Sequence, residues 1–226
     1  MSKALHPFLD DDRLRRQIDF LVEIDRLKMV LRQTVLTDGS RPENTAEHSW
    51  HIALMVMVLA EWSNEPIDSV RVLEMLLVHD LVEIDAGDTF CYDEAANLDK
   101  AAREEQAADR IFGLLPSDQG AHLRSRWEEF EARETPEARF ANAVDRLQPM
   151  MHNYLTSGHS WRRHGIGRDR VEERNRPIAD GAEELWRFAR RFLDDAQNQG
   201  WLRAGSRSTR ESLAVEDVIP TAEADG

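Results

Sequence analysis

The sequence predicts an all-α protein, and three observations lead to this prediction. Apolar residues recur at steps of three and four along most of the chain, which is typical of amphipathic helices. No segment alternates apolar and polar residues over the length of a strand, so we expect no sheet of consequence. The 226 residues, 41% of them hydrophobic, suffice for one substantial core. We therefore expect a single helical bundle over residues 1–203 and a disordered tail of small and polar residues over 204–226.

Capping residues mark the first two helices. Acidic residues precede an amphipathic pattern that predicts a helix from Asp12 to about Gln33. A run of turn formers then predicts that the chain reverses direction. Asn44 and Glu47 have the spacing of a capping box and predict a second helix, which continues to about Trp62.

The remaining helices follow from similar signals. A third helix is expected from residue 66 to about Asp85, where Gly87 ends it. Two amphipathic segments follow, over residues 97–115 and around Trp127. Thr135 before a proline and an acid is a typical helix start, and the helix that it opens carries Asp145. A last helix is expected over residues 171–197, interrupted near residue 177.

Composition narrows the class of protein. The one cysteine, Cys91, leaves no internal disulfide and no thiolate cluster for zinc, so we expect a reducing compartment, most simply the cytoplasm. The longest apolar run, Ile52–Ala60, is too short to span a bilayer, and we expect no membrane partner. A formal charge of −14 argues against binding a nucleic acid polymer. An anionic substrate would need local positive charge, which favours a mononucleotide over a polymer.

The ten residues from His79 to Asp88 predict a functional site. They hold one imidazole and four carboxylates, directly after a largely apolar run where a buried helix would be expected to stay apolar. On a helix, His79 and Asp80 lie about 100° apart and can approach one point. Glu83 shares their face and could reach a water bound to the same ion.

A metal site at this helix needs ligands from other segments. His48 and Asp145 each interrupt an otherwise apolar segment and are the candidates. Two histidines and two carboxylates leave open coordination positions and suit Mn²⁺, Fe²⁺, Co²⁺, Mg²⁺ or Zn²⁺. His51, three residues after His48, could be a further ligand, but we expect it to pack or hydrogen-bond beside the site.

The order of these residues resembles the HD-domain metal-dependent phosphohydrolases, and most closely their 5′-deoxynucleotidase branch. His48, then His79-Asp80, then Asp145 lie on successive expected helices of an all-α chain. The resemblance runs from about residue 20 to residue 155. Its motif segments are Arg41–His48, Leu76–Glu83, Gly87-Asp88 and Ala143–Arg146.

The resemblance implies a metal centre and two proton-handling groups. It assigns one divalent cation to four ligands: His48, His79, Asp80 and Asp145. Glu83 would deprotonate or orient the attacking water, or protonate the leaving oxygen. Asp88 would assist by proton transfer or by fixing the substrate. Between the His-Asp pair and the last aspartate the only histidine is His122, which favours one metal ion rather than two.

The resemblance also implies how substrate is bound. Arg32 matches the phosphate-binding arginine of the family, and its guanidinium fork suits a terminal phosphate. Gln33 stands where the bacterial deoxynucleotidases have a tryptophan that excludes the ribose 2′-hydroxyl, so the sequence does not predict the sugar preference. The family implies a homodimer.

The sequence therefore predicts an enzyme that removes phosphate from nucleoside 5′-monophosphates, including deoxynucleotides. Two alternatives stay open. One is hydrolysis of a nucleoside triphosphate or an alarmone, although few Lys and Arg residues flank the motif. The other is a non-catalytic module that senses a nucleotide or metal, although such a module would not need Glu83 and Asp88.

Overall fold

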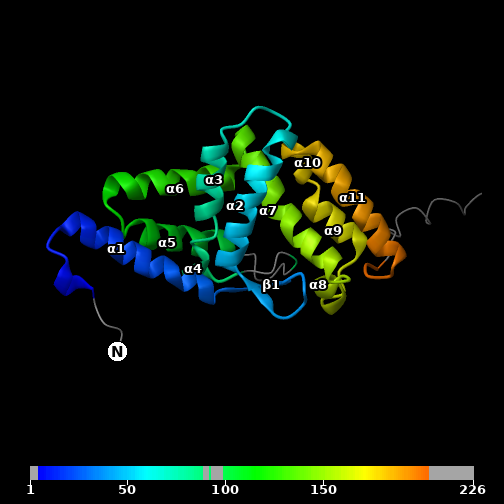
Figure 1. Cartoon of the computed structure of the whole chain (residues 1–226), viewed down its shortest axis with the longest axis horizontal. Coiled ribbons are helices and arrows are strands. Elements are labelled where there is room, and N and C mark those ends of the chain that lie inside the picture. Colours follow the sequence, from blue (N-terminus) through cyan, green and yellow to red (C-terminus); the bar gives the residue numbers. More distant parts are fainter. Residues whose placement is uncertain (1–4, 89–91, 93–98, 204–226) are drawn as a thin grey trace, which may run out of the picture.

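The computed structural model describes residues 5–88, 92 and 99–203, and the predicted tail over 204–226 lies outside them. The described part is helical apart from one short two-stranded sheet, as expected (Figure 1). The longer helices are α1 (Asp12–Ile24), α2 (Thr45–Leu59), α3 (Ser69–Val78), α5 (Lys100–Phe112), α6 (Ser117–Ala132), α7 (Pro136–Leu155), α9 (Arg168–Asn175) and α11 (Glu183–Asn198). The short elements are η1 (His6–Phe8), η2 (Asp25–Met29), β1 (Leu31–Val35), β2 (Pro42–Asn44), η3 (Ala60–Trp62), α4 (Glu83–Ala86), α8 (His159–Arg163) and α10 (Ile178–Gly181).

Helices α2, α3 and α7 form the middle of the molecule. In Figure 1, α1, α5 and α6 lie on one side of them and α9, α10 and α11 on the other. The core has two corresponding parts: one cluster joins α2, α3 and α7 to α9–α11, and a second joins α1, α5 and α6 to residues 78–82. The turn after α3 therefore lies where the two clusters meet. No helix within the described ranges is long and apolar enough to cross a membrane.

The predicted first helix is wrong beyond residue 24. Helix α1 ends at Ile24, a 3₁₀ turn follows, and Leu31–Val35 forms a strand that pairs antiparallel with Pro42–Asn44. The sequence Met29-Val30-Leu31 is a short apolar run that fits a helix or a strand equally well, so periodicity could not distinguish them. Arg32 and Gln33 consequently lie on β1 rather than at the end of a helix.

The predicted helix from residue 66 to 85 is also divided. Helix α3 ends at Val78, four residues form turns, and α4 begins at Glu83. The amide of Leu81 bonds to the carbonyl of Val78 and that of Glu83 to the carbonyl of Asp80, which are the i→i−3 bonds of a tighter 3₁₀ winding. This change of winding leaves the apolar pattern intact, so the sequence did not reveal it.

The helix starts agree with the predicted caps because capping is local. The Asn44 side chain accepts from the amide of Glu47, whose carboxylate accepts from the amide of Asn44. Thr135 accepts from the amide of Ala138 at the start of α7. Gly87 ends α4 with a φ of 75°, a conformation that L residues rarely adopt. Helix α7 also contains Pro149, which has no amide hydrogen to donate within the helix.

Helix α10 packs so closely on α7 that only glycine fits at residue 181. A Cβ there would overlap the carbonyl oxygen of Arg139 and lie 2.8 Å from the amide nitrogen of Phe140. We expect Gly181→Ala to lower the free energy of unfolding by about 1–3 kcal/mol, since backbone atoms must move to admit the methyl group. Urea unfolding would measure this loss. Ala101→Ser, which adds one atom at an exposed position of α5, should stay within about 0.5 kcal/mol of wild type, and equal losses would contradict the packing argument.

Candidate functional site

His48 is fully buried in the first turn of α2 and presents a lone pair to Asp145. Its Nδ1 donates to the side-chain oxygen of Gln148 (3.1 Å), and its Nε2 lies 3.0 Å from Oδ1 of Asp145. The amide group of Gln148 is oriented by Glu43, whose Oε1 accepts from Nε2 of Gln148 (2.7 Å). With its proton on Nδ1, His48 has an unprotonated Nε2 facing a carboxylate.

His79 makes the corresponding arrangement from the turn after α3. Its Nδ1 donates to the carbonyl of Leu76 (2.9 Å), and its Nε2 lies 3.1 Å from Oδ2 of Asp80 and 3.7 Å from Oδ1 of Asp145. The buried ring packs on Phe130, with 4.8 Å between ring centroids. The backbone contact and the ring contact fix the direction in which Nε2 points.

These four side chains fit a divalent cation. One ligand atom each from His48, His79 and Asp145 lies within 4.8 Å of the others, and Asp80 adjoins His79. Nε2 of His79 is buried with no hydrogen-bond partner. Imidazole lone pairs that face carboxylate oxygens repel them unless positive charge lies between, and histidines that donate their other nitrogen to a carbonyl are typical metal ligands.

The pKa shifts of the two histidines and of Asp145 also indicate that this point favours positive charge. Burial lowers the pKa of His48 to about 4, so that ring is neutral at pH 7. Burial also disfavours charge on His79, but the carboxylates of Asp80 and Asp145 outweigh it and raise the pKa of His79 well above its ordinary value. Burial is likewise outweighed at Asp145, whose pKa the two histidines hold well below its usual range. A proton on His79 therefore supplies positive charge at the point where a metal cation would bind.

Arg32 reaches the cluster from β1. Its Nη1 donates to Oδ2 of Asp80 (3.0 Å), and its Nε lies 3.9 Å from Oε2 of Glu43. The Asp80 carboxylate contributes to raising the pKa of Arg32 despite burial, so the guanidinium stays charged. Gln33, next along the strand, has its side chain exposed at the rim of the same cavity. Its backbone bonds to the carboxylate of Asp88, and its carbonyl accepts from Oγ of Ser160 (2.8 Å).

Glu83 and Asp88, the two predicted proton-handling groups, line one cavity with Asp80 and Asp145. Glu83 is buried, and its Oε2 accepts from the hydroxyl of Thr45 (3.0 Å). Burial and the nearby charge of Asp80 raise the pKa of Glu83 well above its ordinary value, and burial raises that of Asp88. Carboxyl groups with raised pKa values can exchange protons near neutral pH.

The cavity also contains cationic side chains that sequence reasoning had not assigned to it. Lys100 of α5, Arg146 of α7 and Arg174 of α9 line it together with Arg32. Lys100 forms an ion pair with Glu104 (3.2 Å), and Arg146 donates to the backbone carbonyl of Arg174 (2.6 Å). Only Arg146, adjacent to Asp145, gave a sequence signal. The local positive charge that an anionic substrate needs is therefore present.

Comparison with known proteins agrees with this geometry. The HD domain family matches residues 24–186. The human 5′-deoxynucleotidase HDDC2 is 32% identical over 138 residues, which cover 61% of this chain and 66% of the human protein. The 5′-deoxynucleotidase hdd1 of Schizosaccharomyces pombe is 28% identical over 137 residues, 58% of this chain and 67% of the yeast protein. This chain thus spans about two thirds of the length of these relatives.

A crystal structure with a similar fold covers more of the chain. It is that of a predicted metal-dependent phosphohydrolase from Magnetospirillum magnetotacticum MS-1, with 53% sequence identity and a TM-score of 0.81. The alignment covers 84% of this chain and 96% of the bacterial one. Since the HD domain match alone covers well over half of the residues, this protein belongs to the HD domain family.

Proposed function

We propose that this protein is a metal-dependent phosphohydrolase that removes phosphate from nucleoside 5′-monophosphates, including deoxynucleotides. The observation that carries the proposal is the meeting of His48, His79, Asp80 and Asp145 beside a cavity that holds both acids and cations. The names of the human and yeast relatives support the nucleotide class, and the bacterial structure supports metal dependence.

The side chains divide the chemistry among them. His48, His79, Asp80 and Asp145 would hold a divalent cation, which would supply Lewis-acid chemistry that neutralises charge on a phosphoryl group and makes water more acidic. Glu83 accepts the proton of the attacking water through its buried carboxylate, which Thr45 holds in place. Arg32 binds a phosphate oxygen through its guanidinium, exchanging part of its contact with Asp80. Asp88 orients the substrate or returns a proton to the leaving oxygen.

The preference for ribose or deoxyribose would be set by Gln33, which lines the cavity. Gln33 carries an amide that can donate to or accept from a hydroxyl group, whereas a tryptophan at this point would exclude one. We propose that the protein accepts ribose as well as deoxyribose at this position. Matched pairs such as AMP and dAMP test this directly through their kcat/KM ratio.

The test of the function is phosphate release from a panel of nucleotides. The protein, stripped of metal and then supplied with Mn²⁺, Co²⁺ or Mg²⁺, should release inorganic phosphate from 5′-monophosphates. Asp80→Ala should release none above background, and equal rates for the two proteins would refute the proposal. Release of pyrophosphate or tripolyphosphate from a nucleoside triphosphate would instead identify a triphosphate hydrolase, and release of pyrophosphate from an alarmone would identify an alarmone hydrolase. Nucleotide binding without turnover would identify a sensor.

We also propose that the protein is a homodimer joined through α2. Four apolar side chains on one face of this helix are exposed: Trp50, Leu54, Met57 and Val58. Trp50, Leu54 and Val58 border an apolar groove with Met151 and Phe188, and contiguous exposed apolar surface of this kind is typical of protein–protein interfaces. A second copy would cover this face by two-fold symmetry.

Placing a charge on this face should prevent association. We expect Val58→Glu to convert a dimer to a monomer in light scattering coupled to size exclusion, because the carboxylate would be buried without a partner. Met29→Glu is the control, since Met29 is also exposed but lies outside α2. A wild-type protein that is already monomeric, or a Val58→Glu protein that remains dimeric, would contradict this interface.

A further inference from the structure

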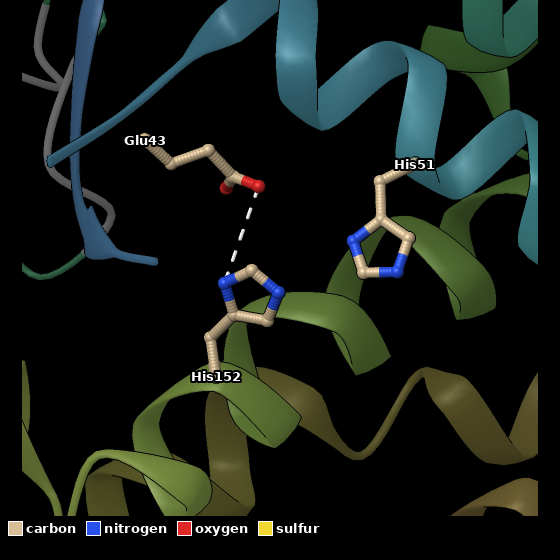
Figure 2. Close-up of side chains that lie close together, drawn as sticks. All are labelled: Glu43, His51 and His152. Carbon is tan, nitrogen blue, oxygen red and sulfur yellow. Dashed lines mark ion pairs between the residues drawn. The ribbon is translucent and has the colours of Figure 1, made fainter. Parts of the chain in front are cut away.

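A second group of side chains of the metal-ligand type comes from three different elements. Glu43 of β2, His51 of α2 and His152 of α7 point toward one another (Figure 2). One ligand atom from each lies within 4.8 Å of the others. Glu43 and His152 are buried, whereas His51 is half-buried and gives the group a route to solvent. The first cluster uses none of these three residues.

The hydrogen bonds in this group leave more lone pairs than donors. His152 donates its Nδ1 proton to the carbonyl of Val35 (3.2 Å), so its Nε2 is an acceptor. The amide nitrogen of Gln148 lies 2.7 Å from Oε1 of Glu43, 3.1 Å from Nε2 of His152 and 3.3 Å from Nδ1 of His51. The two protons of this amide can therefore bond to at most two of these three atoms. Oε2 of Glu43 is, in addition, buried without a hydrogen-bond partner.

We propose that Glu43, His51 and His152 form a second divalent-cation site, separate from the one at His48, His79, Asp80 and Asp145. Two imidazoles and one carboxylate are a ligand set suited to Zn²⁺, Fe²⁺ or Co²⁺, and they leave coordination positions for water. Burial lowers the pKa values of His51 and His152, which keeps both rings neutral and able to ligate at pH 7.

The proposed ion would occupy the place of the Gln148 amide nitrogen, because this nitrogen lies within 3.3 Å of all three ligand atoms. Metal–ligand bonds of about 2.0–2.2 Å require the three side chains to close on this point by about 1 Å. The amide nitrogen must move aside for the ion. The amide oxygen of the same residue accepts from His48, so occupation of the second site disturbs the contact that orients a ligand of the first.

Counting bound ions tests the proposal. Metal-free full-length protein, dialysed to equilibrium against Zn²⁺ or Co²⁺ and measured by elemental mass spectrometry, should bind two ions per chain. His51→Gln should bind one, because glutamine keeps a hydrogen-bonding group but removes the imidazole ligand. Asp145→Asn should also lose one ion, from the other site. His122→Gln, at an exposed histidine that pairs with Glu74 and belongs to neither group, should still bind two.

Two outcomes would overturn the proposal: a wild-type protein that saturates at one ion, or a His51→Gln protein that still binds two. Thermal melting of each metal-free variant establishes that it is folded before ions are counted. Glu43→Gln, which is isosteric with the native side chain, is the replacement should His51→Gln not fold. Phosphatase activity is measured separately, so a failure of the second site would leave the proposed function standing, and the converse also holds.

Discussion

Asp145→Asn should abolish the metal-dependent reaction while preserving the fold. The carboxylate of Asp145 faces Nε2 of both His48 and His79, and its charge is what makes that point attractive to a cation. Asparagine has the same shape, but its amide nitrogen can donate to the lone pair of His48 and satisfy it without an ion. Losing several kcal/mol of transition-state stabilisation corresponds to a fall in kcat/KM of roughly 10³-fold or more.

Titration calorimetry with Mn²⁺ and phosphate-release kinetics would measure both effects in the same variant. Thermal melting without metal at pH 7 should show a folded protein with a lower melting temperature than wild type, because the lowered pKa of Asp145 means that its charge, held by the two histidines, stabilises the folded state. Asp118→Asn is the matched control, since its carboxylate is exposed and pairs with Arg13 on the surface. Unaltered Mn²⁺ affinity in Asp145→Asn would rule out Asp145 as a ligand.

Glu83→Gln should lower kcat by about 10²–10⁴-fold, the range expected when a general base is removed. The glutamine oxygen can still accept from the hydroxyl of Thr45, so the side chain should keep its place. Metal affinity and KM should change little, because the proposed ligands and the phosphate-binding Arg32 are retained. The variant therefore separates proton transfer from binding.

Steady-state kinetics at saturating Mn²⁺, together with calorimetry, would separate these quantities. Glu23→Gln is the control: it removes a carboxylate that bonds to Arg26 and Arg110, away from the cavity. A Glu83→Gln enzyme within tenfold of the wild-type kcat would exclude a base role for Glu83. A loss expressed only in metal affinity would make Glu83 a positioning residue.

The sequence predicted best what local chemistry determines. The caps at Asn44 and Thr135 are correct because a capping side chain and the amide that it binds lie within three residues of one another. The points at which a helix gives way to a turn or a strand are harder to predict from the sequence. The 3₁₀ turn after Val78 and the pairing of β1 with β2 depend on backbone hydrogen bonds, which a short apolar run does not reveal.

The ionisable members of the site were predictable, whereas their neutral partners were not. His48, His79 and Asp145 interrupt apolar segments and so attract attention in the sequence, and one ligand atom of each lies within 4.8 Å of the others in the structure. Gln148 carries no charge and belongs to no motif, yet it lies between His48 and Glu43, which precede it by 100 and 105 residues. The role of a buried amide such as Gln148 can be recognised only from its contacts in the folded structure.

Pro149 interrupts the hydrogen bonding of α7 between residues of the two ligand groups. Proline cannot donate the bond that would reach back to the carbonyl of Asp145, and its ring disfavours straight helical geometry. Asp145 and Gln148 precede this weak point in α7, while His152 follows it. Any change in the angle of the helix at Pro149 therefore alters the separation of the two ligand groups. Pro149 therefore places a missing backbone hydrogen bond of α7 between Asp145 and His152.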